Sequence, residues 1–201
     1  MILRRREEPV IVVSGLPRSG TSMAMGMLAA GGVEIVTDEL RRPDEDNPKG
    51  YFELERVKDL AGGGDRSWLH EARGKAVKII SYLLQYLPGD LRYRVIFMSR
   101  DLDEVLASQA RMLERRGEAP GDSPDRMRQR YVDHLASVRT ILRLRPGFEL
   151  LELNYPAVIE DPLDAAVRIE RFLDRPLDTA SMARAVDPSL YRNRTARPVS
   201  R

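Results

Sequence analysis

Arg18, Thr21 and Ser22 are the side chains with the clearest capacity for chemistry, because they lie in and just after a glycine-bracketed loop. The loop runs from Gly15 to Gly20 and follows a run of four apolar residues. Backbone N–H groups of such a turn and the positive end of the next helix dipole converge on one anion. A guanidinium can bind a phosphate or sulfate oxygen through two donors. These residues predict an anion-binding loop.

The spacing of Gly15 and Gly20 matches the ATP-binding P-loop, but Thr21 stands where a lysine should follow the second glycine. That lysine normally reaches the β- and γ-phosphates of ATP. We therefore expect the loop to bind an anion without cleaving ATP. The simpler interpretation is a tight turn in which Thr21 and Ser22 only cap the next helix. It leaves the coincidence of strand, glycines, cation and hydroxyls unexplained.

A second candidate anion site follows the apolar run from Arg94 to Ser99. A P-loop ATPase often has an aspartate here that supports Mg²⁺, whereas in this chain Arg100 follows the run. Ser108 lies two turns along the next predicted helix, where it can face the same ligand. Taken alone, these would be an exposed arginine and a solvated serine. Beside the loop, we favour a second anion site.

Strand-like runs alternate with helical segments along the chain. The runs show little polar alternation, which indicates strands buried on both faces; they are Val10–Ser14, Glu34–Val36, Lys75–Ile80, Arg94–Ser99 and Glu149–Leu153. Helices are predicted at Met23–Ala30, Asp125–Arg145, Leu163–Leu173 and Thr179–Val186. A further helix is predicted to begin at a capping box formed by Asp101 and Glu104 and to end at Gly117.

This alternation predicts an α/β fold, a P-loop NTPase-like three-layer sandwich. Its central parallel sheet has about five strands and is flanked by helices. Ligands in such sheets bind at the carboxyl ends of the strands. The residues that follow Ser14, Ile80, Ser99 and Leu153 should therefore lie near one crevice.

Composition excludes several classes of protein. The 201 residues suit a single domain over 1–201, with a basic carboxyl tail at about 187–201. The chain has no cysteine, which rules out disulfide frameworks, thiolate metal sites and cysteine nucleophiles. A net charge of +2 does not suit a nucleic-acid binder.

No apolar run approaches the roughly 18 residues that span a membrane. The charged amino end argues against a signal peptide, so we expect a cytoplasmic protein without nucleic-acid or membrane partners.

In these motifs the chain resembles the sulfotransferases that use 3′-phosphoadenosine 5′-phosphosulfate. In this family the loop after the first strand holds the 5′-phosphosulfate. An arginine and a serine eight residues later hold the 3′-phosphate, and Arg100 and Ser108 have the same spacing. The stretch 47–53 (Asn-Pro-Lys-Gly-Tyr-Phe-Glu) is more similar to bacterial and Golgi-type members than to cytosolic hormone-conjugating ones. The resemblance covers about residues 10–176, including Asn154-Tyr155, Asp161-Pro162 and Arg171-Phe-Leu173.

The resemblance implies a sulfotransferase that moves a sulfuryl group from this donor to a hydroxyl or amine of a small-molecule or glycan acceptor by in-line displacement. The implied donor-binding residues are Pro17, Arg18, Ser19, Gly20, Thr21, Ser22, Arg100 and Ser108. Arg18 and the loop amides would neutralise charge on the leaving phosphate, so no metal is required. Two alternatives stay open. A P-loop small-molecule kinase fits the first 30 residues only, and a non-catalytic nucleotide-binding domain would keep the loop without a base.

The resemblance assigns the catalytic base to Glu53, which matches the catalytic glutamate of Golgi-type relatives. Sulfuryl transfer requires the acceptor to lose a proton, and a carboxylate or an imidazole can accept it. Glu53 has an alternative role as the first residue of a helix over 53–60, where an acid is favourable. His70 is the rival base. His134 falls on or beside the apolar stripe of its helix, and we expect it to pack there.

Further cations can belong to the site. Lys78 lies inside the third predicted strand, and a lysine in apolar surroundings needs an anionic partner, so it can meet the sulfate at the end of the strand. Many family members carry lysine at the position of Arg18. Cytosolic members end in a Gly-x-x-Gly-x-Trp-Lys segment that this chain lacks. Its tail offers Arg192, Arg194 and Arg197 instead, either as ligands or as a frayed basic end.

Overall fold

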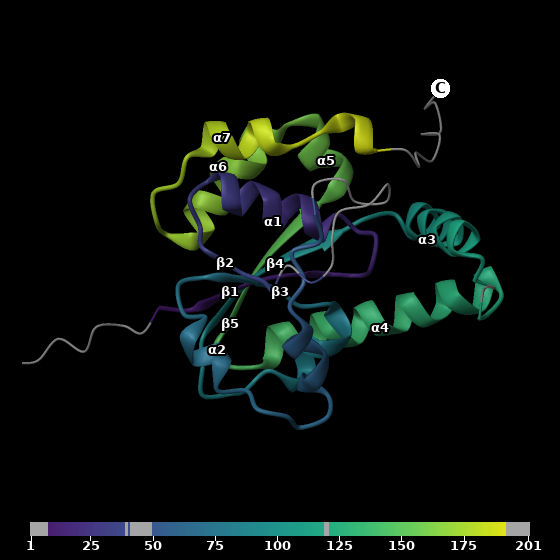
Figure 1. Cartoon of the computed structure of the whole chain (residues 1–201), viewed down its shortest axis with the longest axis horizontal. Helices are drawn as coiled ribbons and strands as arrows, with labels where there is room; N and C mark the ends of the chain where they lie inside the picture. Colours follow the sequence, from purple (N-terminus) through teal and green to yellow (C-terminus); the bar gives the residue numbers. More distant parts are fainter. Residues whose placement is uncertain (1–7, 39, 41–49, 119–120, 192–201) are drawn as a thin grey trace, which may run out of the picture.

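The computed structural model describes residues 8–38, 40, 50–118 and 121–191, and it contains a parallel sheet with helices on both faces (Figure 1). The strand order is β2-β3-β1-β4-β5, and every pairing is parallel. The strands are β1 (Val10–Gly15), β2 (Ile35–Val36), β3 (Ala76–Lys78), β4 (Tyr93–Ser99) and β5 (Phe148–Asn154). The predicted α/β architecture with a five-stranded parallel sheet is confirmed.

The central strand β1 is buried on both faces, because its alternate side chains enter two different apolar cores. Ile11 and Val13 face one core, shared with α1 (Thr21–Ala30), α6 (Pro162–Leu173) and α7 (Thr179–Ala185). On the other face, Val10 and Val12 join a second core. The elements of that core are the 3₁₀ helices η1 (Glu55–Leu60) and η2 (Ser81–Tyr86), α2 (Trp68–Glu71) and α4 (Pro124–Leu144).

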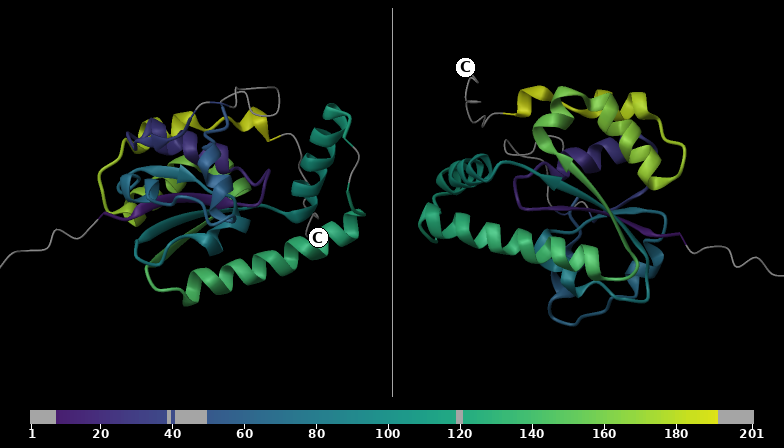
Figure 2. Two further views of the ribbon diagram at one scale, coloured as in Figure 1. Left: turned by 60° about the horizontal axis from the view of Figure 1, so that its bottom comes forward. Right: turned by 180° about the vertical axis from the view of Figure 1, so that it is seen from behind.

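Two further views confirm the layers and place α3 (Leu102–Arg116) at one edge of the sheet (Figure 2). Helices α1, α6, α7 and the short α5 (Tyr155–Glu160) cover one face, and α2 and α4 cover the other. Helix α3 follows β4 beyond the carboxyl ends of the strands. It packs on α4 through a small core of Leu16, Val105 and Tyr131. The first loop, α3 and α4 are therefore held together at the edge where ligands bind in parallel sheets.

Helices α3 and α4 begin at residues whose side chains accept hydrogen bonds from the first N–H groups of the helix, and α3 ends at a glycine. Asp101 accepts hydrogen bonds from the N–H groups of Asp103 and Glu104 at 2.9 and 3.2 Å, which begins α3. Gly117 ends α3 in the left-handed conformation, with φ 66°. Ser123 caps α4 just before Pro124. These bounds lie within one or two residues of the prediction.

The third strand is shorter than predicted. The sequence predicts Lys75–Ile80, whereas β3 spans only Ala76–Lys78. The reason is that the hydroxyl of Ser14 donates to the Ile79 carbonyl at 2.6 Å, so a side chain takes the place of the next ladder hydrogen bond. The edge strand β2 has only two residues and extends the pairing no further.

Four short elements were not predicted: α2, η2, α5 and the 3₁₀ helix η3 (Pro188–Leu190). None is longer than six residues, which is too short for hydrophobic periodicity to emerge. Within the described ranges, no helix combines the length and the apolar character needed to cross a membrane. The predicted tail ligands Arg192, Arg194 and Arg197 lie outside the described residues, as do positions 47–49 of the 47–53 stretch.

His134 lies on α4 and packs against η2, and it should make the stability of the fold depend on pH. Its ring stacks on Tyr82 with 3.7 Å between centroids, and the Ser81 hydroxyl lies 2.8 Å from its Nε2. Burial lowers the pKa of His134 below its ordinary value of 6.5. The unfolded chain then binds the proton more readily than the folded one. The stabilisation is complete above pH 6.5 and is lost as the pH falls through the lower folded pKa.

We expect His134→Gln to reduce the loss of unfolding free energy below pH 6.5, measured by urea titration at a series of pH values. His70→Gln is the matched control. Its side chain is 42% exposed on α2, and the variant should retain the acid-dependent loss of the wild type. Equal profiles for His134→Gln and the wild type would contradict the assignment.

Candidate anion-binding site

The loop between β1 and α1 depends on two glycines, each pressed against another part of the site. A Cβ atom at Gly15 would lie 2.6 Å from the carbonyl oxygen of Met98 on β4. A Cβ atom at Gly20 would lie 2.3 Å from the ring of Tyr155, and the φ of Gly20 is 100°. Only glycine permits that conformation without strain. The loop backbone is therefore brought close to both β4 and α5.

Arg18 extends from the loop to α3. Its Nε donates to the hydroxyl of Ser108 at 3.0 Å. Arg18 has a φ of 70°, one of three positive values among the non-glycine residues that the structure describes. Such a conformation costs of order 1–3 kcal/mol and tends to occur at functional sites. The sequence places Arg18 and Ser108 at separate anions, but the structure puts their side chains in contact.

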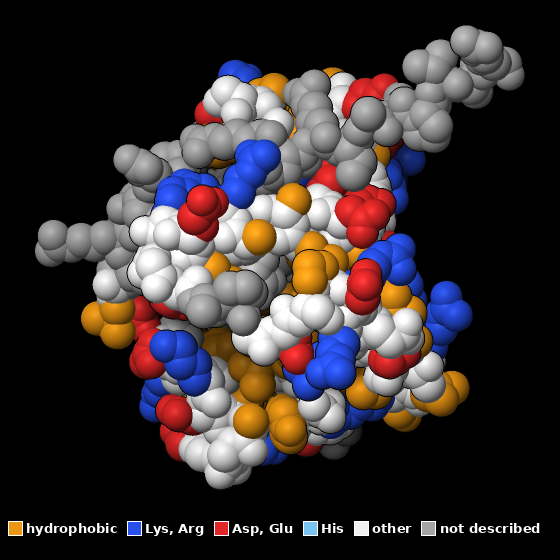
Figure 3. Space-filling model, turned by 90° about the vertical axis from the view of Figure 1, so that its right-hand side faces the viewer, with side chains coloured by type: hydrophobic (Ala, Val, Ile, Leu, Met, Phe, Trp, Pro, Cys, Tyr) orange, Lys and Arg blue, Asp and Glu red, His pale blue; other side chains and the backbone are white. Residues whose placement is uncertain are grey.

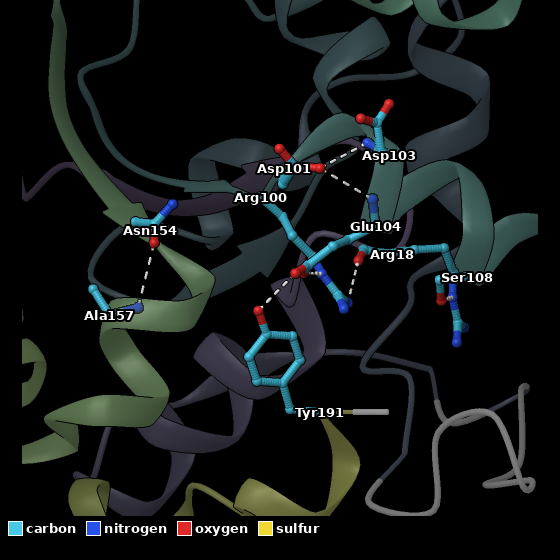
Figure 4. Close-up of polar contacts among 9 residues, drawn as sticks. All are labelled: Arg18, Arg100, Asp101, Asp103, Glu104, Ser108, Asn154, Ala157 and Tyr191. Carbon is cyan, nitrogen blue, oxygen red and sulfur yellow. Dashed lines mark hydrogen bonds and ion pairs between the residues drawn. The ribbon is translucent and has the colours of Figure 1, made fainter. Parts of the chain in front are cut away.

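Arg100 connects the second predicted site to the loop. Its Nη1 donates to the carbonyl oxygen of Arg18 at 3.3 Å, and its Nε donates to Glu104 at 2.8 Å (Figure 4). The side chain is only 6% exposed. The guanidinium carbon lies 4.7 Å from the ring centroid of Tyr155 and 5.1 Å from that of Tyr191. Arg100 thus faces the loop that contains Arg18.

A cavity of about 480 Å³ joins these groups at the carboxyl edge of the sheet. The predicted site residues that line it are Pro17, Arg18, Gly20, Thr21, Ser22, Glu53, Lys78, Arg100 and Ser108. It lies beside β1 and β4, where the strand order reverses and parallel sheets bind ligands. Figure 3 shows this side of the molecule, with basic and hydrophobic side chains close together.

Among the predicted site residues that the structure describes, Ser19 and His70 do not line the cavity. Ser19 is buried, and its hydroxyl donates to the carbonyl of Leu16 at 2.7 Å, which closes the turn. His70 lies on α2, where its ring contacts Arg73 and lies 3.5 Å from Asp90. The structure therefore gives Ser19 a role in shaping the loop, and it places the rival base away from the cavity.

Lys78 and Glu53 form a polar pair inside the cavity. Lys78 is 9% exposed, and its Nζ donates to the Tyr51 carbonyl at 2.7 Å and to the Ser22 hydroxyl at 3.2 Å. The same Nζ lies 3.4 Å from the Glu53 carboxylate. This carboxylate is an anionic partner of the kind that a lysine in an apolar strand requires.

The position of Glu53 differs from the predicted helix start. The helix η1 begins at Glu55, with Leu54 as its N-cap, so Glu53 precedes it and does not stabilise its first turn. The neighbouring Phe52 has a φ of 50°. Phe52 is thus a second strained point, between Tyr51 and Glu53, which both line the cavity.

Glu104, Tyr155 and Tyr191 are site residues that the sequence analysis missed. The prediction treats Glu104 as part of a capping box, yet its carboxylate contacts Arg100 and the Tyr191 hydroxyl. The four-residue spacing from Arg100 gave no helix-face signal, because Arg100 precedes Asp101, the N-cap of α3. Tyr155 belongs to the Asn154-Tyr155 pair of the resemblance but had no role assigned, and Tyr191 carried no signal, because it lies far from Arg100 in sequence. Burial raises the pKa of Tyr155, which keeps its hydroxyl neutral beside Arg100.

Among the described residues, no group of three His, Asp or Glu side chains could hold a metal ion.

No family model and no curated protein matches this chain in sequence. Solved structures do match it. A sulfotransferase domain from the curacin biosynthetic pathway has a TM-score of 0.57 at 14% identity, over 96% of this chain and 94% of that one. The sulfotransferase domain of the Synechococcus PCC 7002 olefin synthase has a TM-score of 0.54 at 16% identity, over 97% and 92%. The fold is that of the sulfotransferases.

A third similar structure is mouse sulfotransferase SULT7A1 in complex with PAP, with a TM-score of 0.52 at 17% identity. The match covers 90% of this chain and 63% of the mouse protein. The resemblance found in the sequence motifs is therefore confirmed for the fold. Within this sulfotransferase fold, the cavity between the first loop and Arg100 is the candidate site.

We expect Gly20→Ala to lower the free energy of unfolding by about 1–3 kcal/mol, because the new Cβ meets Tyr155 and the backbone is left-handed. Urea denaturation measures the change. Gly26→Ala on α1 is the matched control. Its added Cβ meets nothing within 4 Å, so the variant should gain about 0.5–1 kcal/mol from helix propensity. Equal effects of the two substitutions would contradict the close packing of the loop.

Proposed function

We propose that this chain is a sulfotransferase that uses 3′-phosphoadenosine 5′-phosphosulfate as its donor. The observation that carries the proposal is the meeting of two arginine-bearing segments in one cavity. Arg18 comes from the loop and Arg100 from the end of β4, and one hydrogen bond joins them. A ligand with anionic groups at two positions of one adenosine suits such a site. The sulfotransferase fold and the PAP complex of the mouse protein support this choice.

The cavity suits the donor in size and charge. Its volume of about 480 Å³ lies in the ordinary range for nucleotide-sized ligands. Helix α1 begins at Thr21, and the backbone N–H groups at the N-terminus of a helix can bind an anion. Arg18, Lys78 and Arg100 supply positive charge around it. We assign the loop and α1 to the 5′-phosphosulfate, and Arg100 with Ser108 to the 3′-phosphate.

Glu53 and Lys78 are the residues that we assign to the reaction itself. The acceptor oxygen or nitrogen forms a bond to sulfur, while the bond from sulfur to the phosphate oxygen breaks and leaves its electron pair on the phosphate. Glu53 takes the proton that the acceptor loses. Lys78 lies between Glu53 and Ser22, where its charge can stabilise the sulfuryl oxygens.

The role of Arg18 changes with the geometry. The sequence suggests that Arg18 neutralises the leaving phosphate, but its side chain is hydrogen-bonded to Ser108 on α3. We therefore assign the guanidinium of Arg18 to donor binding beside Ser108. The loop amides and Lys78 carry the electrostatic part of the reaction. The acceptor is a small molecule or a glycan with a hydroxyl or amine.

Calorimetry in EDTA separates this function from a P-loop kinase. We expect 3′,5′-bisphosphoadenosine to bind without any metal, and ATP to bind at least about tenfold more weakly. A kinase would instead need Mg²⁺ and would prefer ATP. Tight ATP binding that depends on Mg²⁺ would overturn the proposal.

Glu53→Gln separates an enzyme from a non-catalytic nucleotide-binding domain. The wild type should transfer radiolabelled sulfate from the donor to a member of a panel of phenols, alcohols and amines. The variant should lower kcat by about 10²–10⁴-fold, because the proton acceptor is lost, while the affinity for 3′,5′-bisphosphoadenosine stays the same. The matched control is Glu55→Gln, an exposed acid paired with Lys58 at 2.8 Å. Donor binding by the wild type without turnover of any acceptor would support the non-catalytic alternative.

A further inference from the structure

The second anion site contains a buried carboxylate, which is unexpected beside a group meant to bind a phosphate. Glu104 is 3% exposed, and its Oε2 lies 2.8 Å from Nε of Arg100. A carboxylate next to this arginine neutralises its charge and repels an incoming anion. Arg100 lines the cavity, whereas Glu104 does not, so the carboxylate contacts the arginine without lining the cavity itself. A physical role for Glu104 must offset that repulsion.

We propose that Glu104 is a positioning residue that orients Arg100 toward the 3′-phosphate of the nucleotide, and that Tyr191 holds Glu104 in place. The inference rests on the proposed function, which supplies the 3′-phosphate. It adds two residues to the donor site that the sequence motifs do not contain.

Glu104 is itself held from three directions. Its backbone N–H donates to Asp101 at 3.2 Å in the first turn of α3. Its Oε2 accepts from Arg100, and its Oε1 accepts from the Tyr191 hydroxyl at 2.8 Å. Figure 4 shows both side chains converging on this carboxylate. The carboxylate therefore has a defined orientation before any ligand arrives.

The same contacts define the plane of the Arg100 guanidinium. Nε is held by Glu104, and Nη1 donates to the carbonyl oxygen of Arg18. Tyr155 and Tyr191 contact the guanidinium through their rings, and these two rings meet edge to face at 5.2 Å. Arginine binds phosphate best when its planar fork has a fixed direction. A guanidinium fixed in advance loses less conformational freedom on binding.

Simple electrostatics and positioning predict opposite outcomes when Glu104 loses its charge. If the carboxylate only repels the ligand, Glu104→Gln leaves a more positive site, and a 3′-phosphate binds more tightly. If the carboxylate orients Arg100, the same variant frees the guanidinium, and the 3′-phosphate binds more weakly. The sign of the change therefore decides between the two roles.

The test compares two probes that differ only at the 3′ position, 3′,5′-bisphosphoadenosine and adenosine 5′-monophosphate. We expect calorimetry on Glu104→Gln to show a loss of at least about tenfold in affinity for the bisphosphate. The affinity for the monophosphate should change less than about twofold. Asp103→Asn is the matched control, an exposed acid one residue earlier on α3 that pairs with Arg128. It should bind both probes as the wild type does.

Tyr191→Phe provides a second variant if loss of the buried charge prevents folding. It keeps the ring over Arg100 and removes only the hydroxyl. We therefore expect the affinity for the bisphosphate to fall about threefold and the affinity for the monophosphate to stay the same. Tighter binding of the bisphosphate to Glu104→Gln would overturn the proposal. An equal loss for both probes would also overturn it, because that result indicates a purely structural role.

The Nε–H signal of Arg100 gives a readout that needs no ligand. In the NMR spectrum of the wild type we expect a slowly exchanging Nε–H proton, assigned by its loss in Arg100→Lys, that exchanges faster in Tyr191→Phe and in Glu104→Gln. Unchanged exchange in these variants would overturn the positioning role. A wild type that binds neither probe but shows the protected proton would contradict the proposed function and not the contact between Glu104 and Arg100.

Discussion

The parallel pairing of β1 with β4 is the constraint on which the candidate site depends. Its register sets Gly15, the last residue of β1, opposite Met98 of β4. Arg100 follows Met98 by two residues, so it leaves the sheet beside the loop that follows Gly15. The Met98 carbonyl leaves no room for a side chain at Gly15. The loop and Arg100 are thus brought within hydrogen-bond distance by backbone geometry. The hydrogen bond from Arg100 to the Arg18 carbonyl then links two segments that are 82 residues apart.

The neighbouring pair of strands brings the reactive groups to the same edge. Val13 of β1 lies opposite Lys78 of β3, which places the lysine level with the end of the first strand. Lys78 then contacts Ser22 at the start of α1 and Glu53 on the other side. One central strand therefore positions the loop that contains Arg18, the residue Arg100 and the proposed base. This arrangement explains why β1 is buried on both faces, since cores on both sides hold it rigidly.

Predictions from the sequence succeeded where the signal is local. The side chain of Asp101 and the left-handed backbone of Gly117 set the bounds of α3, and both act within one turn. Strands β1, β3 and β4 were found because burial on both faces leaves continuous hydrophobic runs, whereas the edge strands β2 and β5 are only partly buried. Glu104 was misjudged because a glutamate three residues after an N-cap also suits a capping box. Its contact with Tyr191 joins residues 87 apart and has no local signature.

The sequence by itself determined the glycine-bracketed loop after the first strand, the alternation of strands and helices, and the cation that follows the fourth strand. These features follow from short-range sterics, capping and hydrophobic periodicity. Only the tertiary structure decided that Arg18 reaches Ser108, that Lys78 pairs with Glu53, and that His70 lies away from the cavity. Those contacts depend on which strands are neighbours and in which register. That choice is made by packing over the whole chain, so no local pattern of residues records it.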